Sequence, residues 1–440
     1  MTTERPLATF VADLSTEDIP DAVTDRAGLT VADTIGVIIA GSRDPAVQSL
    51  AGHWNETASG NATVLGTGTV STTANLAAFC NGAAGTVLEL DEGHRFAAGH
   101  PAIHVLPALL ADAEVDYGNG DAFLEAFVAG YEVAVRVARA TAPLAEGYHP
   151  HGVWGTVGGA AAVAHHRNLD VERIQTAMSI AANYAQHTLF AAATEGATVR
   201  NGYAGMSNLA ALVAVDQAEA GFTALADGIS RHLSLAAGDE FEDDAVLADL
   251  GERWELLRGY FKIHAACRYT HPVLDAVEKL RGDIDPAAIR TVSVETYPAA
   301  TRLNEPRPHN ALQAKFSIPF AVATALLTGE TGPEAFEDDA ITPEAKALAE
   351  RVTVSVGEEF AARAPEKRGA RVTVDLGERQ VSQSIEAPRG GEHDPFSEAQ
   401  LHEKFRSITT PVIGADRSSE LWRSARSLEA PRVLCTLAQG

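Results

Sequence analysis

The sequence predicts a mainly α-helical protein with a smaller α+β domain, and three observations lead to this fold class. Up to about residue 260, apolar and small residues recur mostly at helical spacing. After about residue 285, several short segments alternate apolar and polar residues, as strands do. A Pro-Arg-Gly-Gly break at 388–391 precedes a last helical stretch. We therefore expect a large all-helical bundle domain over 1–260, completed by 394–440, with an inserted α+β lid domain over 261–393.

Tightly packed helices are expected before residue 260. The segment 29–40 carries apolar residues at helical spacing and is followed by Gly41, a common C-terminal cap. Asp121 is expected to cap a long helix over 122–140. Their many small residues allow helices to approach closely. Further helices are expected at 16–24, 158–166, 171–187 and 208–220, and a short hairpin or extended turn at 62–70.

The predicted lid domain contains strands that alternate in polarity, together with a helix over 314–328. A Leu-Gly-Glu turn at 376–378 is expected to join the last two strands. This combination indicates a compact α+β unit. The expected strands are 290–297, 351–356, 371–375 and 380–385.

Length and charge restrict the class of protein. Domains cluster at roughly 100–200 residues, so 440 residues suggest two or three domains. A net charge of −25 argues against nucleic acid or an anionic membrane as a partner, because both require a basic patch. No apolar run approaches the roughly 18–20 residues of a membrane span. The N-terminus lacks a basic segment followed by an apolar one, so no secretory signal is expected.

Cysteine and lysine usage add two expectations. Cys80, Cys267 and Cys435 lie far apart, which argues against a disulfide framework or zinc ribbon and favours a cytoplasmic protein. Six lysines stand against 28 arginines. Such an acidic, lysine-poor chain is typical of proteins that stay hydrated in concentrated salt, and equally of GC-rich genomes. The sequence leaves these two explanations open.

Histidines gather in three segments, each mixed with charged residues or beside Gly or Pro. The first holds His94, His100 and His104, next to acidic residues and Arg95; the second is GYHPHG, and the third is FKIHAACRYTHP. Loops on a rigid scaffold often carry catalytic residues, and histidine moves protons near neutral pH without further tuning. The sequence therefore indicates an acid–base site.

A cofactor-free carboxylate site fits these segments better than other kinds of site. No metal-binding spacing, GxSxG or complete phosphate loop is present. Arg200, Lys262 and Arg268 could hold substrate carboxylates while His or Asp moves protons. Structural roles remain as alternatives: His104 could pack in a core, and Arg200 could pair with one of the many acidic groups.

Several blocks, in order along the chain, resemble the MmgE/PrpD family. They include ANLAAFCNGAAGTVLELDEGH, GYHPHGVWGTVGGAAA, TVRNGYAGMSNLAALVA, FKIHAACRYTHPVLDA and HDPFSEAQLHEKF. The resemblance runs from about residue 60 to 405. It implies a helical domain with a smaller α+β lid domain, usually a homodimer, without metal or organic cofactor. Enzymes of this family act on small polycarboxylates and include 2-methylcitrate dehydratase and cis-aconitate decarboxylase.

The resemblance also implies site residues. The family's acidic cluster matches Glu89, Asp91 and Glu92, and Gly93 stands where the family has threonine. Arg200 replaces a lysine, and Cys267 stands where the decarboxylase branch has histidine. We expect catalytic roles for Asp91, His100, His149, Lys262 and His271. We expect substrate-binding roles for Glu89, Glu92, His94, Arg200, Tyr203, Cys267 and Arg268.

The implied function is that of a lyase dehydrating a small polycarboxylate such as 2-methylcitrate. Removing water from a β-hydroxy acid needs a base for the carbon proton, an acid for the hydroxyl and cations for the developing charge. Asp91 and His100 are expected to supply the base, and His149 the acid. Decarboxylation, epimerisation and carboxylate binding without catalysis remain alternatives, although Gly93 and Cys267 count against decarboxylation.

Overall fold

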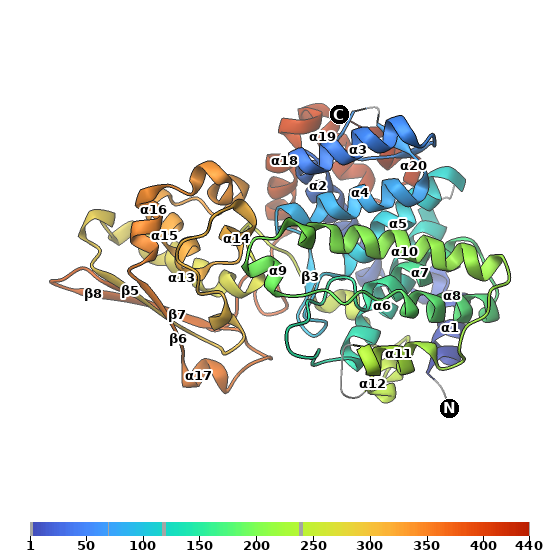
Figure 1. Ribbon diagram of the computed structural model, residues 1–440, viewed down its shortest axis with the longest axis horizontal. Helices are drawn as coiled ribbons and strands as arrows, with labels where there is room; N and C mark the ends of the chain where they lie inside the picture. Colours follow the sequence, from blue (N-terminus) through green and yellow to red (C-terminus); the bar gives the residue numbers. More distant parts are fainter. Residues whose placement is uncertain (1–2, 69, 117–119, 237–240, 440) are drawn as a thin grey trace.

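The computed structural model describes residues 3–68, 70–116, 120–236 and 241–439. It confirms a mainly α-helical fold with a smaller α+β part. Figure 1 shows most of the helices as one large body, with the α+β part beside it. Among the described residues, no helix combines the length and apolarity needed to cross a membrane.

The large part is built from helices on both sides of the α+β segment in sequence. Its first helices are α1 (Glu4–Asp13), α2 (Asp21–Gly41), α3 (Pro45–Thr57), α4 (Ala74–Val87), α5 (Pro101–Asp116), α6 (Gly120–Ala140), α7 (Gly155–His166), α8 (Val171–Asn183), α9 (Ala191–Thr194), α10 (Gly202–Glu219), α11 (Gly228–Ala236) and α12 (Asp243–Leu247). Its last are α18 (Glu398–Ile413), α19 (Ala415–Arg426) and α20 (Pro431–Leu437). Helices α18 and α19 pack on α2, and α20 packs on α5.

Small residues permit the close helix packing that the sequence predicts. A Cβ atom on Gly130 of α6 would lie 2.7 Å from the carbonyl oxygen of Gly158 in α7. The reverse distance, from a Cβ on Gly158 to the carbonyl oxygen of Gly130, is also 2.7 Å. Both values are too short for real contacts, so neither position accepts a larger residue without moving a helix.

Several helix boundaries differ from the sequence predictions. A 3₁₀ turn at Thr16–Asp18 precedes a single α2, where two helices were predicted. Helix α6 begins at Gly120, so Asp121 lies in its first turn and is not its cap. Helix α8 ends at Asn183, short of the predicted 187.

The helix predicted over 314–328 is two helices, α14 (Ala311–Lys315) and α15 (Ile318–Thr328). The hydroxyl of Ser317 caps α15 by accepting a hydrogen bond from the Phe320 amide at 3.0 Å. Pro319 lies in the first turn of α15, where its missing N–H costs nothing. A capped start at this point therefore replaces a continuous helix.

The α+β part holds a four-stranded mixed sheet in the order β6-β5-β7-β8. Strand β5 (Thr291–Thr296) runs parallel to β6 (Val352–Val356) and antiparallel to β7 (Ala370–Asp375), which pairs with β8 (Gln380–Ile385). All four predicted strands are present. The helices of this part are α13 (His271–Leu280), α14, α15, α16 (Pro343–Ala349) and α17 (Glu358–Ala361).

Two short pairings complete the fold. Strands β1 (Ala62–Thr63) and β2 (Ser71–Thr72) pair antiparallel, which confirms the predicted hairpin, whose Thr69 lies outside the described residues. Strand β3 (Gly93–His94) pairs with β4 (Gly259–Tyr260). This second pair brings the acidic segment after α4 beside the segment that carries Lys262.

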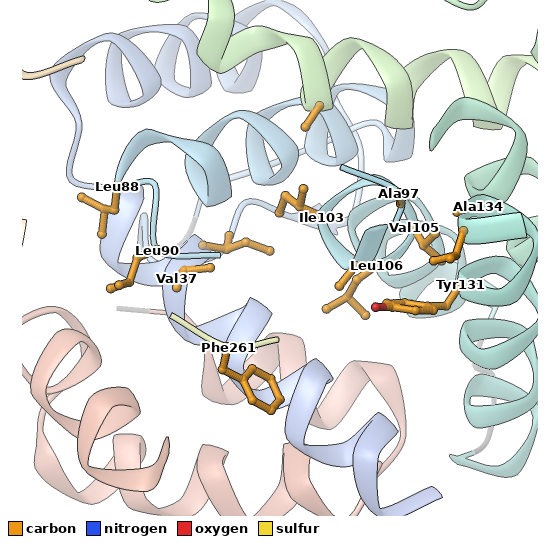
Figure 2. Close-up of a cluster of buried hydrophobic side chains, with 14 of the residues drawn as sticks. Val37, Leu88, Leu90, Ala97, Ile103, Val105, Leu106, Tyr131, Ala134 and Phe261 are labelled. Carbon is orange, nitrogen blue, oxygen red and sulfur yellow. The ribbon is translucent and has the colours of Figure 1, made fainter. Parts of the chain in front are cut away.

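A buried apolar cluster supports both of these segments. Figure 2 shows Val37 of α2, Leu88 and Leu90 after α4, Ile103 of α5 and Phe261 after β4 together in this cluster. Leu90 and Phe261 are each only 1% exposed. Burial of these side chains fixes the backbone on either side of the acidic residues, since packed apolar cores leave little room for movement.

Candidate active site

A cavity of about 240 Å³ lies between the helical part and the α+β part. Residues from the segments 89–100, 138–151 and 260–269 line it, together with side chains of the α+β part such as Phe316. The sequence-predicted residues on its wall are Glu89, His100, His149, Arg200, Cys267 and Arg268. The structure thus brings six of the twelve predicted residues, from distant segments, to one cavity.

Asp91 holds His100 in a defined protonation state. His100 Nδ1 lies 2.6 Å from Asp91 Oδ2, and both side chains are buried. Burial raises the pKa of Asp91, but the charges of His100 and Lys262 outweigh burial and leave the pKa below its ordinary value. Burial in turn lowers the pKa of His100, so at neutral pH its imidazole is neutral and the Asp91 carboxylate accepts a hydrogen bond from Nδ1–H. His100 Nε2 is then a lone-pair acceptor, as a general base requires.

Buried charges of alternating sign surround this pair. Lys262 Nζ donates to the Glu89 carbonyl at 2.9 Å, and lies 3.3 Å from Glu89 Oε2 and 3.6 Å from Asp91 Oδ1. The Arg200 guanidinium pairs with the Glu89 carboxylate and also donates to the Thr86 carbonyl at 3.0 Å. Burial lowers the pKa of Lys262 to about 8. Lys262 is not among the described residues that line the cavity, so it supports Glu89 and Asp91 from behind.

His149 is held in the opposite tautomer to His100. The backbone N–H of His151 donates to His149 Nδ1 at 3.1 Å, so a neutral His149 carries its proton on Nε2. Burial lowers the pKa of His149 to about 3, which keeps the ring neutral at neutral pH. The ring stacks on Phe190 with centroids 5.5 Å apart. His149 can therefore offer a hydrogen bond to a substrate oxygen without carrying a positive charge.

The segment before α13 places a guanidinium and a thiol on the cavity wall. Arg268 Nη1 donates to His271 Nδ1 at 3.2 Å, and His271 Nε2 donates to the Ala266 carbonyl at 3.1 Å. Both nitrogens of His271 are thus occupied, and this residue positions Arg268 from outside the cavity lining. Burial raises the pKa of the Cys267 thiol, which disfavours a nucleophilic thiolate.

Three further predicted residues lie away from the described cavity lining. His94 Nε2 lies 3.4 Å from Glu255 Oε2, in a cluster with several arginines. Glu92 accepts hydrogen bonds from the Tyr131 hydroxyl at 2.6 Å and the Ala102 amide at 3.2 Å, and burial raises its pKa to about 7. Tyr203 packs edge-on against His149, with centroids 5.8 Å apart. Their positions indicate support of the site and not contact with a ligand.

One group of side chains has the composition of a metal site. His264, Asp275 and Glu278 offer ligand atoms within 4.8 Å of one another. The Arg389 guanidinium already donates to Asp275 at 2.8 Å and pairs with Glu278. A cationic side chain therefore occupies the position between the carboxylates, and the group is explained as an ion-pair network.

The predicted site residues leave out much of the cavity wall, including His151, Tyr260, Arg302 and Arg368. The HPH spacing was a signal for His151, whose ring lies between those of His100 and His149 at centroid distances of 4.6 and 4.7 Å. Arg368 lies in no motif that we recognised, on the segment just before β7. Only the folded chain places it at the cavity.

The chain belongs to the MmgE/PrpD family. The family model of the N-terminal domain matches residues 5–233, and that of the C-terminal domain matches residues 264–430. This result confirms the family expected from the sequence and makes the protein a member of a lyase family.

Relatives in the same family are similar along nearly their whole length. A cis-aconitate decarboxylase of Aspergillus terreus is 26% identical, over 94% of this chain and 90% of the relative. The cis-aconitate decarboxylase-like protein oryM of Aspergillus oryzae is 27% identical, over 96% and 94%. The cis-aconitate decarboxylase of Homo sapiens is 26% identical, over 98% and 94%. None of these three is described as a 2-methylcitrate dehydratase, so that activity remains a prediction.

Proposed function

We propose that this protein is a lyase that removes water from a small tricarboxylic acid by abstracting a proton next to a carboxylate. One observation supports this more than any other: His100 and His149 line the same cavity with opposite hydrogen-bonding states. One ring presents an acceptor nitrogen and the other a donor. Elimination of water needs both kinds of group at once.

In the proposed reaction, His100 Nε2 takes the carbon-bound proton, and its C–H electron pair forms the new double bond. The C–O bond breaks, and the hydroxyl leaves as water after receiving a proton. The imidazolium of His100, stabilised by Asp91, is the source of that proton. Neutral His149 donates a hydrogen bond to the departing oxygen or to a carboxylate, because its low pKa leaves the imidazolium, the form that could give up a proton, almost unpopulated at neutral pH.

Guanidinium groups at the cavity suit a polyanionic substrate. Arg200 is paired with Glu89, so its charge is largely offset. Arg268 is bonded to neutral partners, the His271 ring and the Pro388 carbonyl, and keeps its full charge. Cations of this kind bind the carboxylates of a polyanionic substrate.

A second candidate is decarboxylation of a cis-aconitate-like acid, which the names of the relatives favour. There, the bond to one carboxylate breaks, carbon dioxide leaves, and the electron pair moves through the double bond. A proton is added to the distant alkene carbon. The same two histidines could serve this reaction, with a protonated His100 as the donor.

One experiment separates these reactions. The purified protein is incubated with cis-aconitate, citrate and 2-methylcitrate, while proton NMR follows products and a coupled assay follows released carbon dioxide. We expect reversible exchange of water between hydroxy acid and alkene, with no carbon dioxide. Release of carbon dioxide in proportion to consumed cis-aconitate would favour the second candidate. If neither reaction occurs and His100→Gln behaves as the unmodified protein, both proposals are wrong.

We also propose that the protein acts as a homodimer. Exposed large apolar side chains come repeatedly from one stretch of the helical part: Tyr184, Leu189, Val199, Met206, Phe222 and Leu225. Exposed apolar groups in such number are typical of an interface. Light scattering coupled to gel filtration tests this, and a mass of about 46 kDa in solution, the mass of one chain, would contradict it.

A further inference from the structure

Four arginines meet where the main cavity adjoins a second, smaller cavity of about 40 Å³. Arg95 and Arg258 line only the smaller cavity, whereas Arg268 and Arg368 line both. The two pairs therefore occupy different positions relative to the proposed reaction site.

The first pair has acidic partners. Arg95 lies 3.6 Å from Glu366 and 3.5 Å from Glu392, and Arg258 lies 2.9 Å from Glu255. Arg268 and Arg368 differ, because no carboxylate of the described residues forms an ion pair with either. The positive charge that is not offset by protein carboxylates thus lies on the wall shared by the two cavities.

Neutral groups orient these two guanidiniums. Arg268 lies over the Tyr260 ring at 4.2 Å and donates to the Pro388 carbonyl at 3.2 Å. Arg368 donates to the carbonyl of Arg95 at 2.8 Å and lies over the Tyr269 ring at 5.5 Å. Each guanidinium has five N–H donors, so donors remain for a ligand.

Burial makes the missing counter-charge informative. Arg268 is only 6% exposed, and Arg368 is half-buried. A buried charge normally has an ionic partner, because removal from water is costly, and two neighbouring cations also repel each other. The arrangement becomes favourable when an anion enters. Carboxylates match guanidinium groups in shape and can accept paired hydrogen bonds.

We propose that Arg368, together with Arg268, forms a second carboxylate subsite on the wall that the two cavities share. This inference rests on the proposed function, since it concerns the same substrate. Arg368 belongs to the α+β part, and its bond to the Arg95 carbonyl ties that part to the helical part. A substrate held both here and by His100 and His149 would bridge the two parts of the chain. The substrate is accordingly a tricarboxylic acid with one carboxylate away from the reacting carbons.

The test is a binding measurement that needs no turnover. Isothermal titration calorimetry compares propane-1,2,3-tricarboxylate with methylsuccinate, which lacks one terminal carboxylate. We expect Arg368→Gln to bind the tricarboxylate roughly 10- to 100-fold more weakly and methylsuccinate unchanged. Arg368→Lys should recover part of the affinity. The matched control is Arg363→Gln on the same domain, because Arg363 is exposed and pairs with Glu386 at 3.6 Å.

The outcomes separate this inference from the proposed function. If Arg368→Gln binds the tricarboxylate as tightly as the unmodified protein, the subsite proposal is wrong, whether or not the protein turns over any acid. Equal weakening for both ligands also overturns it, because the effect would then be general. If selective weakening is observed but no acid is turned over, the subsite stands and the proposed lyase reaction is wrong. Failure of the unmodified protein to bind the tricarboxylate contradicts the subsite.

Discussion

Replacing Asp91 with asparagine tests the proposed base most directly. The amide side chain would have nearly the same size as the carboxylate but no charge, so the contact with His100 Nδ1 at 2.6 Å would lose its ionic character. An amide can also present its NH₂ group, which would favour the other imidazole tautomer and occupy His100 Nε2 with the proton. We expect kcat to fall by roughly 10²- to 10⁴-fold.

The pH profile gives the sign of the effect. His100 acts as a base when unprotonated, so kcat/KM rises as pH passes upward through its pKa. Burial lowers the pKa of His100, and the Asp91 charge raises it in opposition. Removing that charge lowers the pKa of His100 further. The acid limb of the profile should therefore move to lower pH while the plateau falls.

Asp33→Asn is the matched control. Asp33 is 3% exposed and accepts a hydrogen bond from Lys404 Nζ at 2.6 Å, but it is not among the described residues that line the cavity. Both variants should lose about 1–3 kcal/mol of stability, because each leaves a buried lysine with a weaker partner. Denaturant unfolding and initial rates are measured on both. The assignment of Asp91 as the partner of the base His100 is refuted if Asp91→Asn keeps kcat within threefold of the unmodified protein. It is also refuted if the acid limb of the pH profile moves to higher pH.

Five further outcomes are expected. Lys262→Arg should lose turnover nearly as fully as Lys262→Ala, because Glu89 and Asp91 surround the compact ammonium of Lys262 and a planar guanidinium has a different shape. Steady-state kinetics measure this, and normal turnover in the Arg variant would contradict it. Turnover should also fall above pH about 8 as Lys262 loses its proton. The contribution of Lys262 to stability should instead rise from about pH 8 to 10.5, because the unfolded chain keeps that proton longer; urea unfolding against pH measures it. His149→Ala should lower kcat by about 10²-fold with little change in melting temperature, and unchanged kcat would remove His149 from the mechanism. Activity should survive exhaustive chelation; loss with EDTA and recovery with added metal would show that a metal is required.

The strands and the helices were predictable to different degrees. Alternation of apolar and polar residues is visible in the sequence itself, so each predicted strand agrees with β5 to β8 within one or two residues. Helices were predicted at 16–24 and 29–40, whereas α2 runs unbroken through Gly28. In the structure, a Cβ on Gly28 would collide with the carbonyl oxygen of Arg426. That glycine serves contact with α19, which no local pattern reveals.

The candidate site divides in the same way. Asp91 and His100 lie nine residues apart, so their pairing follows from a short loop that the sequence already marks. Lys262 was predicted to hold a substrate carboxylate, whereas the structure surrounds its Nζ with Glu89 and Asp91. Arg368 reaches the cavity through the packing of one domain on another. Contacts that depend on such packing carry no signature in a single sequence.

The charge of the protein and the charge of its cavity have opposite signs, and they act at different stages of binding. The net charge of −25 repels a tricarboxylate during its approach. Charges on the surface are separated from the ligand by water and are largely screened beyond about 8–10 Å at moderate salt. Arg268 and Arg368 would instead touch the bound carboxylate in a partly dry site, where screening is weak. The acidic surface should therefore slow association, whereas the two guanidiniums should slow dissociation. An acidic protein can on this basis hold a polyanion tightly, provided that cations without an acidic partner line the cavity.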